Sequence, residues 1–278
     1  MQTVLTIAGF DPSSGAGVTA DLAVFAAHGL FGTSCITSLT VQSTRGVRST
    51  HPVDPNIIRN TLEALAEDLP PAGIKIGMLS NADAVTQVVD FLVGVRRRSQ
   101  SVPVVLDPVL YSSSGKELLE PSGVDLLRSQ LLPLVNWVTP NLEELAILTG
   151  LSVKSQADIS NAASALQSLA TNGREQKINV LATAGHRNPP DDLLSSAEGM
   201  SVWIPGRHIA SMSTHGTGCA LSSALLSRLV LGDQPYAAAL AAKQYVAEAI
   251  RSAVPRGGGN GPLNHLWPLH SADIPPLK

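Results

Sequence analysis

A short glycine-rich stretch, His215-Gly216-Thr217-Gly218-Cys219, has the residue types best suited to chemistry in this chain. It leads into a pattern that predicts a helix over residues 220–231, whose first backbone N–H groups have no partner within the helix. These donors, the helix dipole and the small glycines predict an anion site. The same field is expected to lower the pKa of the Cys219 thiol. Glycines alone would indicate only a tight turn; His215 and Cys219 on either side favour function.

Alternating strands and helices are predicted to position this stretch. Strands are expected at 4–8, 34–41, 74–79, 104–107, 137–139 and 178–182, with helices at 19–28, 55–66, 81–92, 158–170, 220–231 and 235–254. A further helix is expected to begin within 140–145. We read 96–98 as a solvated turn, 188–196 as a polar loop and 201–212 as two β segments. The alternation predicts one doubly wound α/β domain over residues 1–269, with a mainly parallel sheet and helices on both faces. Residues 270–278 are expected to form a flexible tail.

Composition narrows the class of protein. Hydrophobic residues make up 44% of the 278 residues and charged residues 15%, which indicates a globular chain. A net charge of −3 argues against nucleic acid as a partner. Cys35 and Cys219 are too few for a disulfide framework. With no leader pattern and no apolar run of membrane-spanning length, we expect a cytoplasmic protein without a membrane partner.

Acidic side chains follow two of the predicted strands. Asp107 comes at the carboxyl end of one, where it is placed to act through Mg²⁺ on nucleotide phosphates. Asn141 and Glu144 follow the next, and the same spacing is typical of a helix capping box. Like Asp107, Glu144 follows a predicted strand, so it is a candidate metal ligand, and it can cap the helix at the same time.

The motifs resemble those of a known enzyme family. The run T-H-G-T-G-C at 214–219, followed by Leu221 and Ser222, resembles the signature of the hydroxymethylpyrimidine/phosphomethylpyrimidine kinases of thiamine biosynthesis, in the ribokinase-like superfamily. The opening loop A-G-F-D-P-S-S-G-A-G at 8–17, K-I-G-M-L at 75–79, N-x-x-E at 141–144 and G-P-L-N-H at 261–265 agree in the same order. The resemblance covers roughly residues 4–265.

This resemblance implies an ATP- and Mg²⁺-dependent kinase that phosphorylates 4-amino-5-hydroxymethyl-2-methylpyrimidine and then its monophosphate. It implies substrate contacts at Gly9, Asp21, Gln42 and Met78, metal ligands at Asp107 and Glu144, nucleotide contacts at Asn141, Thr183, Gly185 and Lys243, and an anion hole at Gly216, Thr217, Gly218 and the Cys219 amide. The Cys219 thiol is the candidate proton acceptor. A homodimer is also implied.

Some of these residues have plainer readings. A strand-end glutamine is often only solvated, yet the Gln42 carboxamide offers the donor and acceptor that an aminopyrimidine edge needs. Asp21 also fits as an acid in a first helical turn, Met78 as core filler and Lys243 as a surface lysine that packs its stem.

The chain departs from the family at Phe10 and Thr19 in the opening loop and at two further positions. Thr183 stands where relatives carry a lysine, which removes a charge from the expected nucleotide side. Lys116 stands where an acid is common, in a loop that matches only at Ser114 and Gly115. Two alternatives therefore stay open. One is a pyridoxal kinase, since pyridoxal shares a heteroaromatic ring with a hydroxymethyl arm. The other is a non-catalytic vitamin-binding protein.

Overall fold

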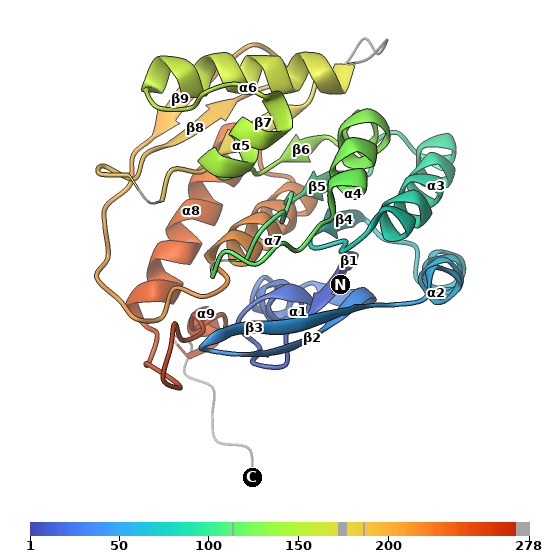
Figure 1. Ribbon diagram of the computed structural model, residues 1–278, viewed down its shortest axis with the longest axis horizontal. Helices are drawn as coiled ribbons and strands as arrows, with labels where there is room; N and C mark the ends of the chain where they lie inside the picture. Colours follow the sequence, from blue (N-terminus) through green and yellow to red (C-terminus); the bar gives the residue numbers. More distant parts are fainter. Residues whose placement is uncertain (113, 172–176, 186, 271–278) are drawn as a thin grey trace.

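The computed structural model describes residues 1–112, 114–171, 177–185 and 187–270, and the proposed tail lies almost wholly outside them. In this part of the chain one sheet has the strand order β3-β2-β1-β4-β5-β6-β7-β8-β9 (Figure 1). Its parallel part consists of β2 (Phe31–Ser43), β1 (Thr3–Phe10), β4 (Gly73–Ile76), β5 (Val104–Leu106), β6 (Trp137–Val138) and β7 (Asn179–Ala182). The antiparallel strands are β3 (Gly46–Pro52), β8 (Asp192–Ser195) and β9 (Ser201–Ile204). The predicted α/β class is confirmed.

Helices cover both faces of the sheet and enclose two apolar cores. One core packs beneath α2 (Pro55–Asp68), α3 (Ala82–Arg98), α4 (Pro121–Leu126), α5 (Leu142–Thr149) and α6 (Gln156–Thr171). The other packs beneath α1 (Gly17–Ala27), α7 (Thr217–Val230) and α8 (Pro235–Arg251), and short α9 (Trp267–His270) lies near α1. Within the described residues no helix is long and apolar enough to span a bilayer.

Several elements were not predicted from the sequence. Strand β3 was not predicted, β8 lies within the expected 188–196 loop, only β9 forms in the expected 201–212 pair, and α4 was not predicted either. Strand β3 lies at a sheet edge, where one face can stay exposed, so it lacks the continuous apolar run that marks the central strands, whereas β8 is buried between β7 and β9 but is only four residues long. A tight turn at residues 43–46 joins β2 to β3.

Arg96 also differs from expectation. The predicted solvated turn at 96–98 is instead the last turn of α3, in which Arg96 is buried while Arg97 and Arg98 are exposed. The Arg96 guanidinium donates to the Leu134 carbonyl oxygen at 2.9 Å and to Asn136 Oδ1 at 2.6 Å. It therefore donates to buried acceptors next to β6, where Asn136 Oδ1 also accepts from the Val104 amide at 2.9 Å.

Candidate active site

The candidate site lies where the parallel strands present their carboxyl ends. Strand β1 ends at Phe10, β5 leads into Asp107, β6 leads to Asn141 and β7 leads to Thr183. Ligands of doubly wound sheets bind outside this edge. Loops after different strands thus bring together residues that are far apart in the sequence.

The predicted anion hole forms at the start of α7. Gly216 precedes the helix with a φ of 86°, and a Cβ there would lie 1.8 Å from the Gly15 carbonyl oxygen, so only glycine fits. No side chain in the described part of the chain caps this helix. The first amides, at Thr217, Gly218 and Cys219, are therefore left to bind an anion.

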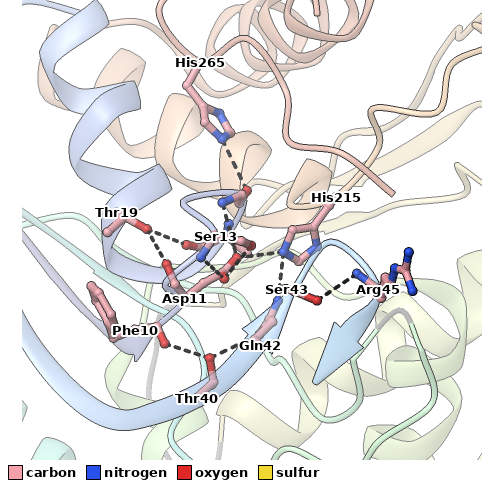
Figure 2. A network of polar contacts seen from close by, with 12 residues as sticks. Phe10, Asp11, Ser13, Thr19, Thr40, Gln42, Ser43, Arg45, His215 and His265 are labelled. Carbon is pink, nitrogen blue, oxygen red and sulfur yellow. Dashed lines mark hydrogen bonds and ion pairs between the residues drawn. The ribbon is translucent and has the colours of Figure 1, made fainter. Parts of the chain in front are cut away.

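Asp11 organises the opening loop beside this hole (Figure 2). One carboxylate oxygen accepts from the Ser13 amide and hydroxyl at 2.8 and 2.7 Å, and the other accepts from the Gly15 and Ala16 amides at 3.2 and 3.0 Å. His215 Nε2 lies 2.7 Å from the second oxygen. Burial alone would raise the pKa of Asp11, but bonds from His215 and Ser13 outweigh it and hold that pKa below its ordinary value. Asp11 thus clamps the opening loop to the segment before α7.

Gln42 joins this network from the end of β2. Its amide lies 2.9 Å from His215 Nε2 at one end and 3.2 Å from the Thr40 hydroxyl at the other, and that hydroxyl donates to the Phe10 carbonyl oxygen. Because His215 Nε2 faces the Asp11 carboxylate, it carries a proton. The structure places the Gln42 NH₂ group toward His215 and its oxygen toward Thr40. We assign the reversed amide, in which the oxygen accepts from His215 and the NH₂ group donates to Thr40, because the Thr40 proton is already donated to Phe10. One N–H and one lone pair of Gln42 then stay available for a ligand.

The predicted substrate contacts divide into two groups. Gly9 and Met78 lie together, since a Cβ on Gly9 would come within 2.9 Å of the Met78 sulfur. Asp21, by contrast, is fully buried. It lies beyond the first turn of α1, which holds no acidic residue, so the alternative role in a first helical turn is wrong, and the substrate contact stays a prediction.

Asp21 instead forms the centre of a buried polar cluster. Its two oxygens lie 3.1 and 2.9 Å from Lys75 Nζ, and they also accept from the Thr6 hydroxyl at 2.6 Å and the Ser223 hydroxyl at 2.7 Å. Lys75 is likewise fully buried. Burial alone would lower the pKa of Lys75, but Asp21 and the neighbouring Cys219 and Asp107 raise it above the ordinary value. Sequence reasoning assigned Lys75 no role, although its inward position on a central strand was the available signal.

The acids at the strand ends are also buried. Asp107 accepts from the Ser222 hydroxyl at 3.1 Å and lies 3.7 Å from where a Gly218 Cβ would be. Burial raises the pKa of Asp107 to about 6, despite the opposing charge of Lys75. Burial and the neighbouring Asp107 raise the pKa of Glu144 to about 8. Two acids therefore share a region that lacks enough positive charge to ionise both.

Cys219 differs from the expected thiolate. Burial of its sulfur raises the pKa of the thiol to about 12, while the Lys75 ammonium and the Gly17 amide oppose that rise. The lost solvation and the nearby acids thus outweigh the groups that favour the thiolate. The pKa of Cys219 is shifted in the direction opposite to the expected one.

The expected nucleotide contacts are partly assembled. Asn141 caps α5 in a capping box, with its amide 2.9 Å from Glu144 Oε2, and it pairs with Thr183 at the end of β7. Gly185 follows with open space beside its Cα, and Lys243 is linked to this loop through Asp192, which accepts from the Ala184 amide at 2.9 Å. The Lys243 ammonium contacts Asp192 Oδ2 at 2.8 Å and also donates to two carbonyl oxygens, so its donors are already used. The structure thus favours the plainer reading of Lys243 as a structural residue.

Replacing Lys75 by methionine is expected to lower the free energy of unfolding by about 3–5 kcal/mol, because the Asp21 charge would stay buried without its partner. Urea unfolding measures this loss. The double variant Lys75→Met/Asp21→Asn removes both charges and is expected to regain most of the stability. Equal losses in the two variants would contradict the importance of the pairing.

Comparison with known proteins agrees with this geometry. The family model described as "Phosphomethylpyrimidine kinase" matches residues 11–264. The chain is 38% identical over 275 residues to the hydroxymethylpyrimidine/phosphomethylpyrimidine kinase of Haemophilus influenzae, covering 95% of this chain and 97% of that one. It is also 38% identical over 266 residues to the protein of the same name from Streptomyces coelicolor, with coverages of 96% and 95%.

Solved structures lead to the same family and to a neighbouring one. Phosphomethylpyrimidine kinase from Clostridium difficile superimposes with a TM-score of 0.75 at 34% identity, covering 90% of this chain and 100% of that one. Bacillus subtilis pyridoxal kinase, solved as an ADP complex, gives 0.83 at 27% identity, with coverages of 98% and 100%. With its ribokinase-like fold, the chain belongs to the phosphomethylpyrimidine kinase family.

Proposed function

We propose that this kinase transfers the terminal phosphoryl group of ATP to the hydroxymethyl group of 4-amino-5-hydroxymethyl-2-methylpyrimidine, and then to the monophosphate so formed. The match of the family model over residues 11–264 carries this proposal. The open helix start at Gly216 and the buried acids Asp107 and Glu144 are the parts that phosphoryl transfer requires. The reaction thus belongs to thiamine biosynthesis.

ATP use is supported by structural neighbours of this chain. Pyridoxal kinases from Bacillus subtilis and Staphylococcus aureus were solved with ADP and with AMP-PCP. In this chain the nucleotide would lie beside Asn141, Thr183 and Gly185. Thr183 offers only a hydroxyl there, so we assign most of the phosphate binding to the backbone amides that start α7.

Mg²⁺ fits the two buried acids. Within the described residues no group of three or more His, Cys, Asp and Glu side chains forms a metal site. Mg²⁺ is commonly held by one or two carboxylates together with substrate phosphates and water, so Asp107 and Glu144 suffice. Burial raises the pKa values of both, and a bound cation would favour their ionised forms. When bound, Mg²⁺ supplies neutralisation of charge on the phosphates.

The remaining work falls to groups of the chain. Gln42, fixed by His215 and Thr40, presents a donor and an acceptor to the pyrimidine edge. The amides of Gly218 and Cys219 hold the transferred group at the positive end of α7. Cys219 is the proposed acceptor of the hydroxyl proton, which requires that substrate and cation binding lower its pKa from the resting value.

Pyridoxal is the second candidate substrate. The pyridoxal kinase structures superimpose with TM-scores up to 0.83, above the 0.75 of the phosphomethylpyrimidine kinase. Sequence identity, by contrast, is higher for the solved phosphomethylpyrimidine kinase, at 34%, than for the Bacillus subtilis pyridoxal kinase, at 27%. Since substrate choice depends on side chains rather than on the fold, we place the pyrimidine first. A cytoplasmic homodimer stays an expectation from the resemblance.

Purified protein with Mg·ATP is expected to release ADP in the presence of the hydroxymethylpyrimidine and of its monophosphate. A coupled ADP assay measures both, with pyridoxal as the third substrate. Turnover of pyridoxal alone would transfer the assignment to the pyridoxal kinases. Binding of the pyrimidine without turnover of any substrate would indicate a vitamin-binding protein.

Stability should depend on pH through Glu144. Its pKa of about 8 exceeds the ordinary 4.5, so the folded chain binds more protons than the unfolded chain between these values. The contribution of Glu144 to the free energy of unfolding is fully present below its ordinary pKa of 4.5. It is lost as pH rises through the folded-state pKa of about 8. The free energy of unfolding of the wild type, minus that of Glu144→Gln, is therefore expected to fall over this range.

Thermal unfolding across pH measures that difference. His28 and His265 have lowered pKa values, so their contributions to the free energy of unfolding increase as pH rises. These contributions are the same in the wild type and the variant and cancel in the difference. At pH 8, Mg²⁺ is expected to raise the melting temperature of the wild type more than that of Glu144→Gln. An equal rise would argue against Glu144 as a metal ligand.

Cys219→Ala is expected to lower kcat by about a hundredfold, the lower end for loss of a proton acceptor. The wild-type kcat should also rise with pH, because the resting thiol must lose its proton, whereas the variant should lose this dependence. Cys35→Ala is the matched control, since Cys35 is buried elsewhere, beside Ile58. An unchanged kcat and pH profile would contradict the role of the Cys219 thiol as proton acceptor. Only its backbone amide would then contribute to phosphoryl transfer.

A further inference from the structure

A basic cavity opens between the β2–β3 turn and residues 114–116. Its volume is about 390 Å³, and it is lined by Ser43, Arg45, Gly46, Val47, Arg48, Ser114, Gly115 and Lys116. This volume falls within the range of small-molecule sites. The cavity thus joins an edge hairpin to a loop that departs from its family at Lys116.

Arg45, Arg48 and Lys116 give this cavity its charge. Among the described residues none of the three lies within ion-pair distance of a carboxylate, although the whole chain carries a net charge of −3. Lys116 Nζ donates to the Arg48 carbonyl oxygen at 2.6 Å, which ties the loop to the hairpin. Three cations gathered without acidic partners predict an anionic ligand.

The cavity adjoins the proposed pyrimidine site. Ser43 directly follows Gln42 in β2, and its hydroxyl accepts from the Arg45 amide at 3.3 Å. The Arg45 guanidinium lies against the glycine segment at 257–261, because a Cβ on Gly258 would come within 2.9 Å of it. That segment accepts from the His215 amide through the Gly261 carbonyl oxygen at 3.1 Å. Figure 2 shows Arg45 beyond Gln42 and His215, at the hairpin turn.

We propose that Arg45, Arg48 and Lys116 form a binding site for the phosphate of a phosphorylated substrate. The site distinguishes the pyrimidine monophosphate from the pyrimidine alcohol. The guanidinium groups offer paired donors that match phosphate oxygens, and the lysine adds a point charge. A dianionic phosphate monoester is the chemistry that three unpaired cations fit, whereas the uncharged alcohol gains nothing from them. The inference rests on the proposed function and adds a preference for the second phosphorylation.

The test compares two substrates in the double variant Arg45→Gln/Arg48→Gln. The ratio of kcat/KM for the monophosphate to kcat/KM for the alcohol is expected to fall about tenfold, as loss of two partly exposed cation–phosphate contacts predicts. In the wild type the same ratio should decline as NaCl increases, because salt screens exposed charges. The salt dependence should be weaker in the variant.

Arg97→Gln/Arg98→Gln is the matched control, since it removes the same charge from an exposed helix end and should leave the ratio unchanged. An unchanged ratio in the hairpin variant would overturn the inference. So would a rise in KM confined to ATP, because the cluster would then serve the nucleotide phosphates. Absence of turnover on both pyrimidines in the wild type would instead overturn the proposed function itself.

Discussion

The ion pair between Lys75 and Asp21 is the interaction on which the site depends. Both side chains are fully removed from water, which costs several kcal/mol for each charge. Four short contacts to the Asp21 carboxylate offset that cost, from Lys75 on β4, Thr6 on β1 and Ser223 on α7. Since Asp21 itself lies on α1, one carboxylate fixes two helices against two central strands. The start of α7, and the anion hole with it, is thereby held at a set distance from the sheet.

The same lysine sets the electrostatics of the groups around it. Its positive charge opposes the rise in pKa that burial imposes on Asp107 and on Cys219. Lys75 carries one positive charge and is paired with Asp21, so it cannot also neutralise both Asp107 and Glu144. Burial still raises the pKa values of Asp107 and Glu144, which suits a site completed by a cation and an anionic nucleotide together.

A second hydrogen-bond network positions the residues on the β2–β3 hairpin side of the site. Asp11 joins the opening loop to His215, and His215 in turn fixes Gln42 at the end of β2. A ligand that contacts Gln42 therefore meets a residue whose rotamer is held from two directions. The β2–β3 turn follows immediately and carries Arg45 and Arg48. Recognition of a ring and of a charged substituent can thus be combined on one strand end.

The sequence by itself determined the alternation of strands and helices, the glycine-rich start of α7 and the acids at strand ends. These features are local, because apolar runs, capping boxes and glycine turns depend on neighbouring residues. The capping box of Asn141 and Glu144 was predicted in full for this reason.

Only the tertiary structure decided which side chains lose their water. Asp21 and Lys75 are 54 positions apart, and nothing in either segment alone shows that they neutralise each other. The thiol of Cys219 was expected to ionise because the helix field is visible in the sequence, while the burial that outweighs that field is not. Arg96 and the edge strands were misjudged for the same reason: burial and pairing are set by residues distant in the chain, through desolvation that no local pattern records.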